Sequence, residues 1–171
     1  MLIVLEGPDG NGKSTLIQQL YEDFGIPKYN SGGPKSKERM IEVLKELTDM
    51  AYSSTRYLVD RVPYISEPIY SKAFGRKPVM LKKILESYYR LPQKIIFCHI
   101  GDQKQALANM SREHKAHKPL EHLLGVEKNH SKITDLYKNL INDLEHKGAN
   151  IFEYDWTNPT HYPQLKEWIR A

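Results

Sequence analysis

Cysteine is almost absent from the sequence, and long apolar runs are absent altogether. Cys98 is the single cysteine among 171 residues, so no disulfide can form within the chain. The longest strongly apolar run, residues 95–98, is far shorter than the ~18 residues that a membrane-spanning helix needs. We expect no secretory signal, because residues 2–5 form a strand-like apolar run that leads straight into a glycine-containing loop. We therefore expect no membrane association and a reducing, cytoplasmic compartment.

A strong bias in composition or charge is also missing. Hydrophobic residues make up 40% of the chain and charged residues 27%, which excludes a disordered or collagen-like protein. The length is that of one domain, so we expect residues 1–171 to form a single unit. A net charge of +4 suits an anionic small molecule or a polynucleotide, and it does not decide between them.

Strand-like apolar segments alternate with helical patterns along the chain. Strands are predicted at residues 2–6, 26–30, 56–60, 94–100 and 150–154. The predicted helices are one ending at Gly25, one capped by Ser36, one from Pro78 to Pro92, one at about 131–147 and one at 162–170. The alternation favours an α/β fold, in which a parallel sheet carries helices on both faces.

The strongest motif is a phosphate-binding loop. Residues 7–14 match G-x4-G-K-[ST] without a mismatch, between a predicted strand and an amphipathic helix. Backbone N–H groups of such a loop bind phosphates, while Lys13 reaches the β- and γ-phosphates and the Ser14 hydroxyl binds Mg²⁺. The expected nucleotide contacts are Gly7, Asp9, Gly10, Asn11, Gly12, Lys13, Ser14 and Thr15. The motif predicts ATP or GTP binding, and we expect ATP and Mg²⁺ as cofactors.

Two motifs carry a resemblance to a known family. IVLEGPDGNGKST, at residues 3–15, resembles the opening of thymidylate kinases, including the acidic third loop position at Asp9. Asp60-Arg61, directly after a predicted strand, resembles the Asp-Arg motif of that family. Residues 62–70 resemble a variant found in phage-encoded members, which would act in the host cytoplasm. Related deoxynucleoside kinases share the architecture.

The resemblance implies a P-loop kinase fold with the sheet order 2-3-1-4-5. It also implies a lid after the fourth strand, at about residues 104–130. Adenine would lie near the loop after the fifth strand, at Asp155, Trp156 and Thr157. A homodimer is left open.

The end of the third predicted strand offers candidate catalytic residues. Asp60 is placed to hold Mg²⁺ as a Walker-B carboxylate does. Arg61 could grip an acceptor phosphate through both guanidinium nitrogens, and Asp9 sits where thymidylate kinases orient the acceptor. Each of the three also has a purely structural interpretation, as a strand-end cap, a surface ion pair or a turn residue. The candidate catalytic residues are Lys13, Asp60, Arg61 and Arg112.

Aromatic and charged side chains follow Asp60-Arg61, in a segment that could form a nucleoside pocket. The candidate substrate residues there, in addition to Asp9 and Arg61, are Tyr64, Glu67, Tyr70 and Arg76. Helix packing is an equally good interpretation of each one alone. Arg76 is the best cation of the segment for a substrate phosphate or a stacked base.

A basic segment follows the fourth predicted strand, where nucleotide kinases carry a lid. Arg112, Lys115 and Lys118 are the candidates for contacting the transferred phosphoryl group, and a solvated helix end is the alternative. Four histidines also lie near: His114, His117, His122 and His130. No cysteine accompanies them, so they are expected to add titratable charge near phosphates and not to bind zinc.

The acceptor is the open question. In deoxynucleoside kinases a glutamate at the end of the second strand takes the proton of the acceptor hydroxyl, and residues 25–37 contain no carboxylate. We therefore expect phosphoryl transfer to a deoxynucleoside monophosphate, as in a thymidylate kinase. The alternatives are a hydroxyl acceptor, on a deoxynucleoside or on a 5-hydroxymethyl pyrimidine in DNA, and a P-loop NTPase switch or binding module without an acceptor.

Overall fold

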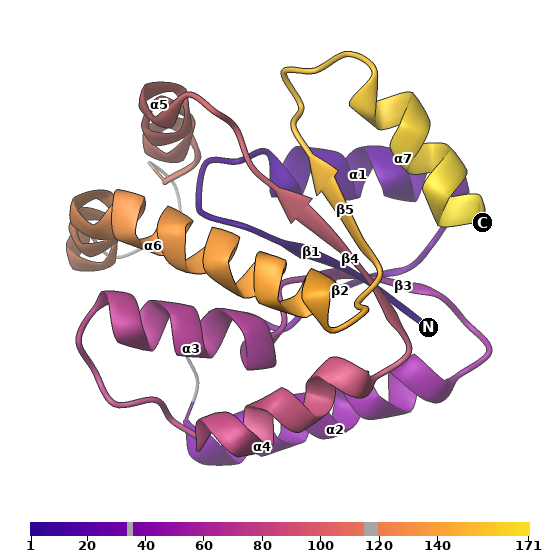
Figure 1. The fold of residues 1–171 in the computed structure, drawn as a ribbon, viewed down its shortest axis with the longest axis horizontal. Helices are drawn as coiled ribbons and strands as arrows, with labels where there is room; N and C mark the ends of the chain where they lie inside the picture. Colours follow the sequence, from indigo (N-terminus) through magenta and orange to yellow (C-terminus); the bar gives the residue numbers. More distant parts are fainter. Residues whose placement is uncertain (34–35, 115–119) are drawn as a thin grey trace.

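The computed structural model describes residues 1–33, 36–114 and 120–171, with only the backbone described at 111, 113–114 and 120–123. Five parallel strands form one sheet in the order β2-β3-β1-β4-β5 (Figure 1). They are β1 (Leu2–Glu6), β2 (Lys28–Asn30), β3 (Tyr57–Asp60), β4 (Gln93–Cys98) and β5 (Ile151–Tyr154). The α/β class and the strand order expected from the sequence are confirmed.

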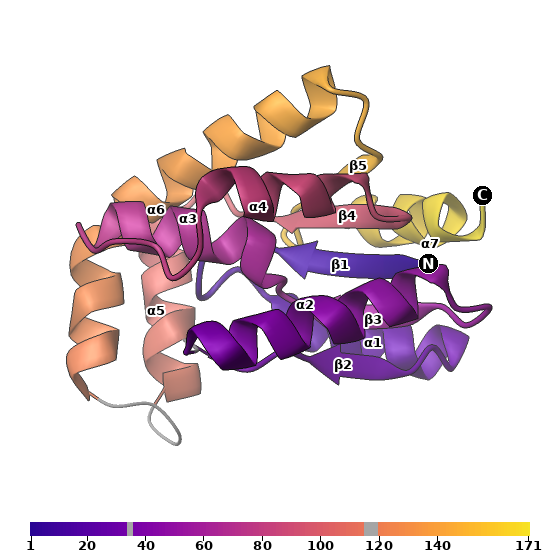
Figure 2. The same ribbon diagram turned by 90° about the horizontal axis from the view of Figure 1, so that it is seen from below.

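Two layers of helices cover the sheet on opposite faces (Figure 1). On one side lie α1 (Lys13–Phe24) and α7 (His161–Arg170). On the other side, in front in Figure 2, lie α2 (Lys37–Tyr52), α3 (Pro63–Ala73), α4 (Lys82–Ser87) and α6 (Leu120–His146). Helix α5 (Gln103–His114) lies beyond the end of the sheet, and a short 3₁₀ turn spans Tyr88–Arg90.

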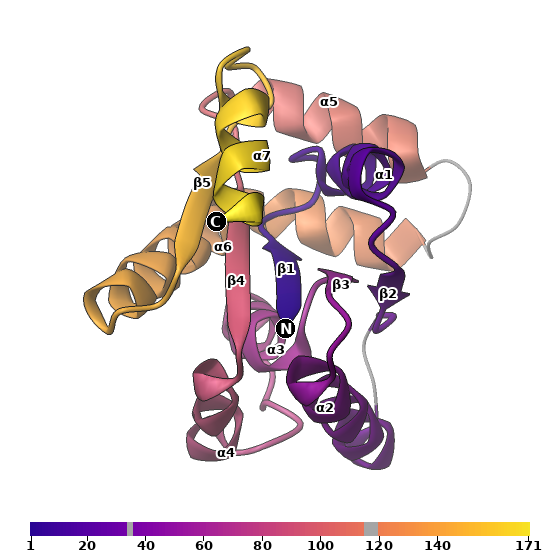
Figure 3. The same ribbon diagram turned by 90° about the vertical axis from the view of Figure 1, so that its right-hand side faces the viewer.

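Strand β1 shows why the sheet sits between two cores. All five of its residues are buried, as expected for a central parallel strand. Leu2 and Val4 pack into the larger cluster with α2, α3 and α6, whereas Ile3 and Leu5 pack with α1 and α7. Alternate side chains of a strand point to opposite faces, so the apolar run fills both layers. The order of strands across the sheet can be followed in Figure 3.

The carboxyl ends of the strands meet at one edge, toward which the arrowheads point in Figure 2. Leu5 of β1 pairs with Asp60 of β3, Asp60 also pairs with Asn30 of β2, and Cys98 of β4 pairs with Tyr154 of β5. The phosphate-binding loop, Arg61 and the loop after β5 therefore start from neighbouring positions. This edge is where ligands bind in open parallel sheets.

Four helix predictions were wrong or incomplete, among them α5, which was not predicted as a helix. The helix expected from Pro78 to Pro92 is only α4 and the following 3₁₀ turn. Helix α3 was not predicted as a helix, because Pro63 and Pro68 interrupt the sequence pattern; Pro63 occupies its first turn and Pro68 lies inside it. Helix α6 begins at Leu120, well before the expected residue 131. The Ser36 cap is confirmed, since its Oγ accepts the Arg39 N–H at 3.2 Å.

None of the helices within the described ranges combines the length and the apolar character that crossing a bilayer requires. Cys98, at the end of β4, is fully buried, and burial raises the pKa of its thiol to about 12. The cysteine therefore belongs to the core.

Candidate active site

The phosphate-binding loop connects β1 to α1 and depends on glycine at two close approaches. A Cβ added at Gly7 would lie 2.1 Å from the Cys98 carbonyl oxygen, and one at Gly10 would lie 2.0 Å from the Ala106 carbonyl oxygen. Both glycines also have positive φ, at 139° and 78°. The loop is thus packed tightly against β4 and α5 by its own backbone, in a conformation that side chains would block.

Lys13 is folded into this loop. Its Nζ donates hydrogen bonds to the carbonyl oxygens of Gly7, at 2.9 Å, and Pro8, at 2.6 Å. Burial and the neighbouring Arg61 charge lower the pKa of Lys13 to about 8. A cation in this position is held by two neutral carbonyls, so an anionic phosphate entering the loop would be a stronger partner.

A buried polar cluster holds Asp9 beside the loop. The Asp9 carboxylate takes Arg61 Nη2 at 3.2 Å on one oxygen and the Tyr70 hydroxyl at 2.8 Å on the other. The Arg61 guanidinium lies 5.3 Å from the centre of the Tyr70 ring and also donates to the Gly7 carbonyl at 3.1 Å. Although burial disfavours its charge, Asp9 and its other neighbours raise the pKa of Arg61. The structure therefore brings together three predicted site residues from the loop, β3 and α3.

Two further side chains, those of Asn11 and His130, form hydrogen bonds with the loop backbone. Asn11 donates to the Pro8 and Asp9 carbonyls, at 3.3 and 3.1 Å, and accepts the Ile100 N–H at 2.8 Å. His130 of α6, which is buried, places Nε2 3.1 Å from the Asp9 carbonyl oxygen. A carbonyl can only accept, so Nε2 carries the proton in this contact. Asn11 and His130 thus both support the loop, and the expected role of His130 in adding charge near phosphates stays a prediction.

Glu6 is a site residue that sequence reasoning missed. It ends β1 directly before the loop and is completely buried. Its Oε1 accepts the Val62 N–H at 2.7 Å, and its Oε2 accepts the Tyr137 hydroxyl at 2.9 Å. Burial, only partly offset by these bonds, raises the pKa of Glu6 to about 7. The signal was present in the sequence, as a carboxylate at the end of a wholly apolar strand.

The predicted Mg²⁺ ligands lie at the same edge of the sheet. The Ser14 side chain is exposed at the start of α1, and Asp60, partly exposed, pairs in register with β1. Asn30 Nδ2 donates to Asp60 Oδ2 at 3.4 Å. The described residues contain no group of three or more His, Cys, Asp or Glu placed to hold a metal ion. One carboxylate with one hydroxyl fits Mg²⁺, which keeps waters and binds substrate phosphates.

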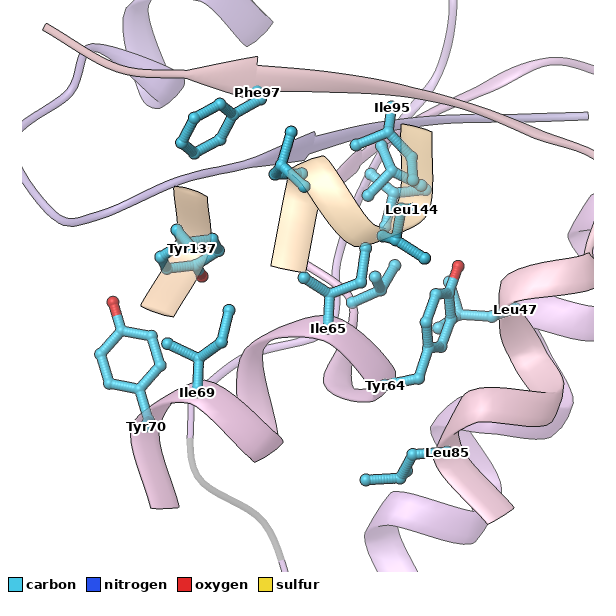
Figure 4. Close-up of a cluster of buried hydrophobic side chains, with 14 of the residues drawn as sticks. Leu47, Tyr64, Ile65, Ile69, Tyr70, Leu85, Ile95, Phe97, Tyr137 and Leu144 are labelled. Carbon is cyan, nitrogen blue, oxygen red and sulfur yellow. The ribbon is translucent and has the colours of Figure 1, made fainter. Parts of the chain in front are cut away.

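Three predicted substrate residues have partners within the protein. Tyr64 is fully buried in the larger core (Figure 4), and its hydroxyl donates to Gln93 at 2.6 Å, so its contact with a substrate stays a prediction. Glu67 and Arg76 bind each other through two hydrogen bonds of 2.6 and 2.7 Å, and Glu67 also accepts the Val79 N–H. The sequence suggested that Arg76 is a cation available to a substrate. In the structure its charge is instead paired with Glu67. A substrate contact of this ion pair stays a prediction.

A cavity of about 410 Å³ adjoins the loop on the side of α1 and α5. Its lining residues are Gly12, Thr15, Leu16, Gln19, Asn109, Arg112, Tyr154 and Trp156. The Trp156 side chain lies over the loop, 3.0 Å from where a Cβ on Gly12 would be. Asp155 accepts the N–H and hydroxyl of Thr157 at 2.9 and 2.6 Å, which shapes the turn that carries Trp156. Thr15, Arg112 and Trp156, predicted separately, thus line one cavity.

Only part of the predicted lid segment is described by the structure. Lys115, Lys118 and His117 lie outside the described residues, and the side chains of His114 and His122 are not described either. Arg112 is the single lid candidate whose position is known, and its side chain is exposed on α5. The function of residues 104–130 as a lid stays a prediction.

Comparisons with known proteins bear on the fold. No protein-family model and no curated protein matches the sequence. A solved structure of the YorR protein from Bacillus subtilis, in complex with phosphorylated GDP, shares 21% identity and a TM-score of 0.67, covering 99% of this chain and 94% of that one.

Two further structures superpose over nearly the whole chain. Deoxyadenosine kinase from M. mycoides with bound dATP has 16% identity and a TM-score of 0.70, covering 100% of both chains. Shikimate kinase from Acinetobacter baumannii has 18% identity and a TM-score of 0.58, covering 99% of this chain and 90% of the other. At these identities the likeness establishes a fold, and that fold is the one of P-loop kinases.

Proposed function

We infer that the protein transfers the γ-phosphoryl group of ATP to a deoxynucleoside monophosphate. The observation that carries this inference is the partly buried Arg61 guanidinium, which faces the phosphate-binding loop and is bonded to Asp9 and Gly7. A cation there suits an acceptor that is already an anion, because two negative phosphates must approach each other. The end of β2 carries Asn30 where a general base would be needed for a hydroxyl acceptor.

The donor side is supported by the loop and the adjoining cavity. The cavity volume suits a nucleoside, with the Trp156 indole as an apolar wall and Arg112 at its edge. The loop amides and Lys13 would bind the phosphates, which displace the Gly7 and Pro8 carbonyls from the Lys13 ammonium. Ser14 and Asp60 would hold Mg²⁺, which neutralises charge on the transferred phosphoryl group.

The acceptor side follows from the cluster around Asp9. Asp9 is fixed on both oxygens by Arg61 and Tyr70, so its orientation is set before substrate arrives. An acceptor bound beside this cluster would place its phosphate against Arg61 and its sugar against Asp9. Arg112, on the donor side, is the candidate that stabilises charge on the phosphoryl group during transfer.

A second candidate function is phosphorylation of a deoxynucleoside hydroxyl. Two observations favour it: Arg76 is neutralised by Glu67, which removes one of the two expected acceptor cations, and Asp60 offers a partly exposed carboxylate that could act as the base. The superposition on a deoxyadenosine kinase fits this candidate equally well.

The deciding experiment supplies γ-labelled ATP and Mg²⁺ with a panel of acceptors, and identifies the labelled product. We expect deoxynucleoside monophosphates to be phosphorylated at least ~10²-fold more efficiently than deoxynucleosides, the scale of one or two lost charge-assisted contacts. Preference for a nucleoside, or for 5-hydroxymethyl pyrimidine in duplex DNA, would replace the leading function by the hydroxyl alternative. Slow hydrolysis of ATP without any labelled acceptor would favour the NTPase switch.

Arg61 variants give the matched comparison. Arg61→Ala should erase most of the preference for the monophosphate, because it removes the partly buried cation of the acceptor side. Arg90→Ala removes an exposed arginine of the 3₁₀ turn and serves as the control. An Arg61→Ala enzyme that keeps the monophosphate preference of the Arg90→Ala enzyme would contradict the assignment of Arg61.

A further inference from the structure

The backbone of Arg61 is strained. Among the residues that the structure describes, Arg61 is the only one other than glycine with a positive φ, at 63°. A left-handed conformation at a residue with a Cβ costs of order 1–2 kcal/mol, and it persists only where the surroundings enforce it. The strain therefore requires contacts that hold the peptides on both sides of Arg61.

Three contacts from two neighbouring strands do this. The Arg61 N–H donates to the Leu5 carbonyl at 3.1 Å, as a continuation of the β1–β3 pairing. The Ser31 hydroxyl, just after β2, donates to the Arg61 carbonyl at 3.3 Å. The following N–H, of Val62, donates to Glu6 Oε1 at 2.7 Å, which is the shortest of the three bonds. The Glu6 contact is also the only one whose acceptor can carry a charge.

Burying the Glu6 carboxylate lowers the stability of the folded state. Glu6 has no exposed surface, and taking a carboxylate out of water destabilises the folded state unless its oxygens are bonded. Both oxygens are bonded, one by Val62 and one by Tyr137. An apolar side chain of similar volume would fill the same space without that cost, so the carboxylate calls for a role beyond packing.

We propose that Glu6 is a positioning residue, which accepts the Val62 N–H and thereby holds Arg61 in the left-handed conformation that points its guanidinium at the phosphate-binding loop. The consequence for catalysis rests on the proposed function, in which Arg61 binds the acceptor phosphate. The claim that Glu6 holds the Arg61 side chain in place does not depend on the proposed function.

Two substitutions separate the hydrogen bond from the volume. Glu6→Gln keeps a carbonyl oxygen for the Val62 N–H, whereas Glu6→Met fills the same space without an acceptor. Tyr137→Phe removes the other bond to Glu6 and leaves the Val62 bond in place. Thermal unfolding of each variant establishes that the comparison is made on folded protein.

The first readout is the NMR signal of the Arg61 side-chain Nε–H in the full-length protein without ligand. The atom is buried, so we expect a slowly exchanging signal in the wild type, in Glu6→Gln and in Tyr137→Phe. In Glu6→Met this signal should shift and exchange at least about tenfold faster, as local opening increases. An unchanged Arg61 signal in Glu6→Met, or an equal loss in Tyr137→Phe, would overturn the positioning role.

The second readout is steady-state kinetics with ATP and the acceptor found active. Glu6→Met should raise the KM for a monophosphate acceptor about tenfold, the scale of one weakened charge-assisted contact, and leave the KM for ATP within about twofold. Glu6→Gln should restore the acceptor KM. Equal losses for donor and acceptor would overturn the proposal. If no monophosphate is phosphorylated by the wild type, the proposed function fails, and the NMR result alone still decides whether Glu6 holds Arg61.

Discussion

Replacing Lys13 by methionine should abolish phosphoryl transfer and at the same time stabilise the ligand-free fold. Burial and the Arg61 charge lower the pKa of Lys13 from 10.5 to about 8. A shift of this size corresponds to about 3 kcal/mol by which the folded state disfavours the charged ammonium at pH 7. Methionine fills a similar volume without that charge, and it cannot contact phosphates.

The hydrogen bonds that Lys13 loses only partly offset this gain. Arg61 Nη2 also donates to the Gly7 carbonyl, and Asn11 Nδ2 also donates to the Pro8 carbonyl. Neither acceptor is left without a partner, so the loss amounts to about 1–2 kcal/mol and not to a full desolvation penalty. We expect Lys13→Met to raise the free energy of unfolding by about 1–2 kcal/mol at pH 7.

The pH dependence identifies the cause. The penalty on the Lys13 ammonium is fully present below its folded pKa of about 8 and vanishes above its ordinary value of 10.5. Between pH 7 and pH 9.5 the wild type should therefore recover about 2 kcal/mol relative to the variant. The advantage of Lys13→Met should disappear over this range.

Urea unfolding, followed by circular dichroism without nucleotide at both pH values, measures the difference. Lys138→Met, on the exposed face of α6, is the control and should change stability by less than about 0.5 kcal/mol. A destabilised Lys13→Met protein at pH 7, or an advantage that is the same at pH 9.5, would refute the reasoning.

Three further predictions concern the loop and its two sides. Gly10→Ala should weaken ATP binding, measured by calorimetry, at least about tenfold, because the added Cβ would lie 2.0 Å from a carbonyl oxygen of α5. Gly101→Ala is the control and should leave ATP binding unchanged, because nothing lies within 4 Å of its Cβ. Tyr70→Phe should lower kcat/KM for the acceptor about five- to tenfold through the lost bond to Asp9, with the KM for ATP unchanged. Trp156→Ala should raise the KM for ATP about three- to tenfold and leave the acceptor KM unchanged, and the opposite pattern would contradict a donor pocket.

The parallel sheet could be predicted from a local signal in the sequence, whereas the order of its strands followed only from the resemblance to thymidylate kinases. Apolar runs such as residues 2–5 are buried on both faces, so they carry no polar alternation and stand out in the sequence. Helix α3 was hidden because two prolines usually end helices, whereas here one starts the helix and the other is tolerated inside it. Helices α4 and α6 both pack against α3, and a local sequence pattern does not contain such contacts.

The loop residues of the site could be predicted, because a phosphate-binding backbone restricts sequence strongly. The partners of individual charges could not. Glu67 and Arg76 are nine residues apart, and only the turn after α3 brings their charged groups within 2.6 Å. Glu6 and Tyr137 are 131 residues apart, and their bond exists only because α6 packs on the same face of the sheet as the larger core. Tyr64 lies within a segment of mixed character, and which face of α3 meets the core is decided by the sheet below it.

The buried thiol of Cys98 can report how often the centre of the sheet opens. It is the only cysteine of the chain, it ends the strand beside the phosphate-binding loop, and its thiol is buried with a pKa of about 12. A thiol reagent reacts with the thiolate, so labelling can proceed only when the centre of the sheet opens. The rate at which Cys98 is modified therefore measures how often this part of the sheet opens. A nucleotide that closes the loop should slow the modification of Cys98. The factor is set by the concentration of the nucleotide and by its affinity, and no turnover is needed.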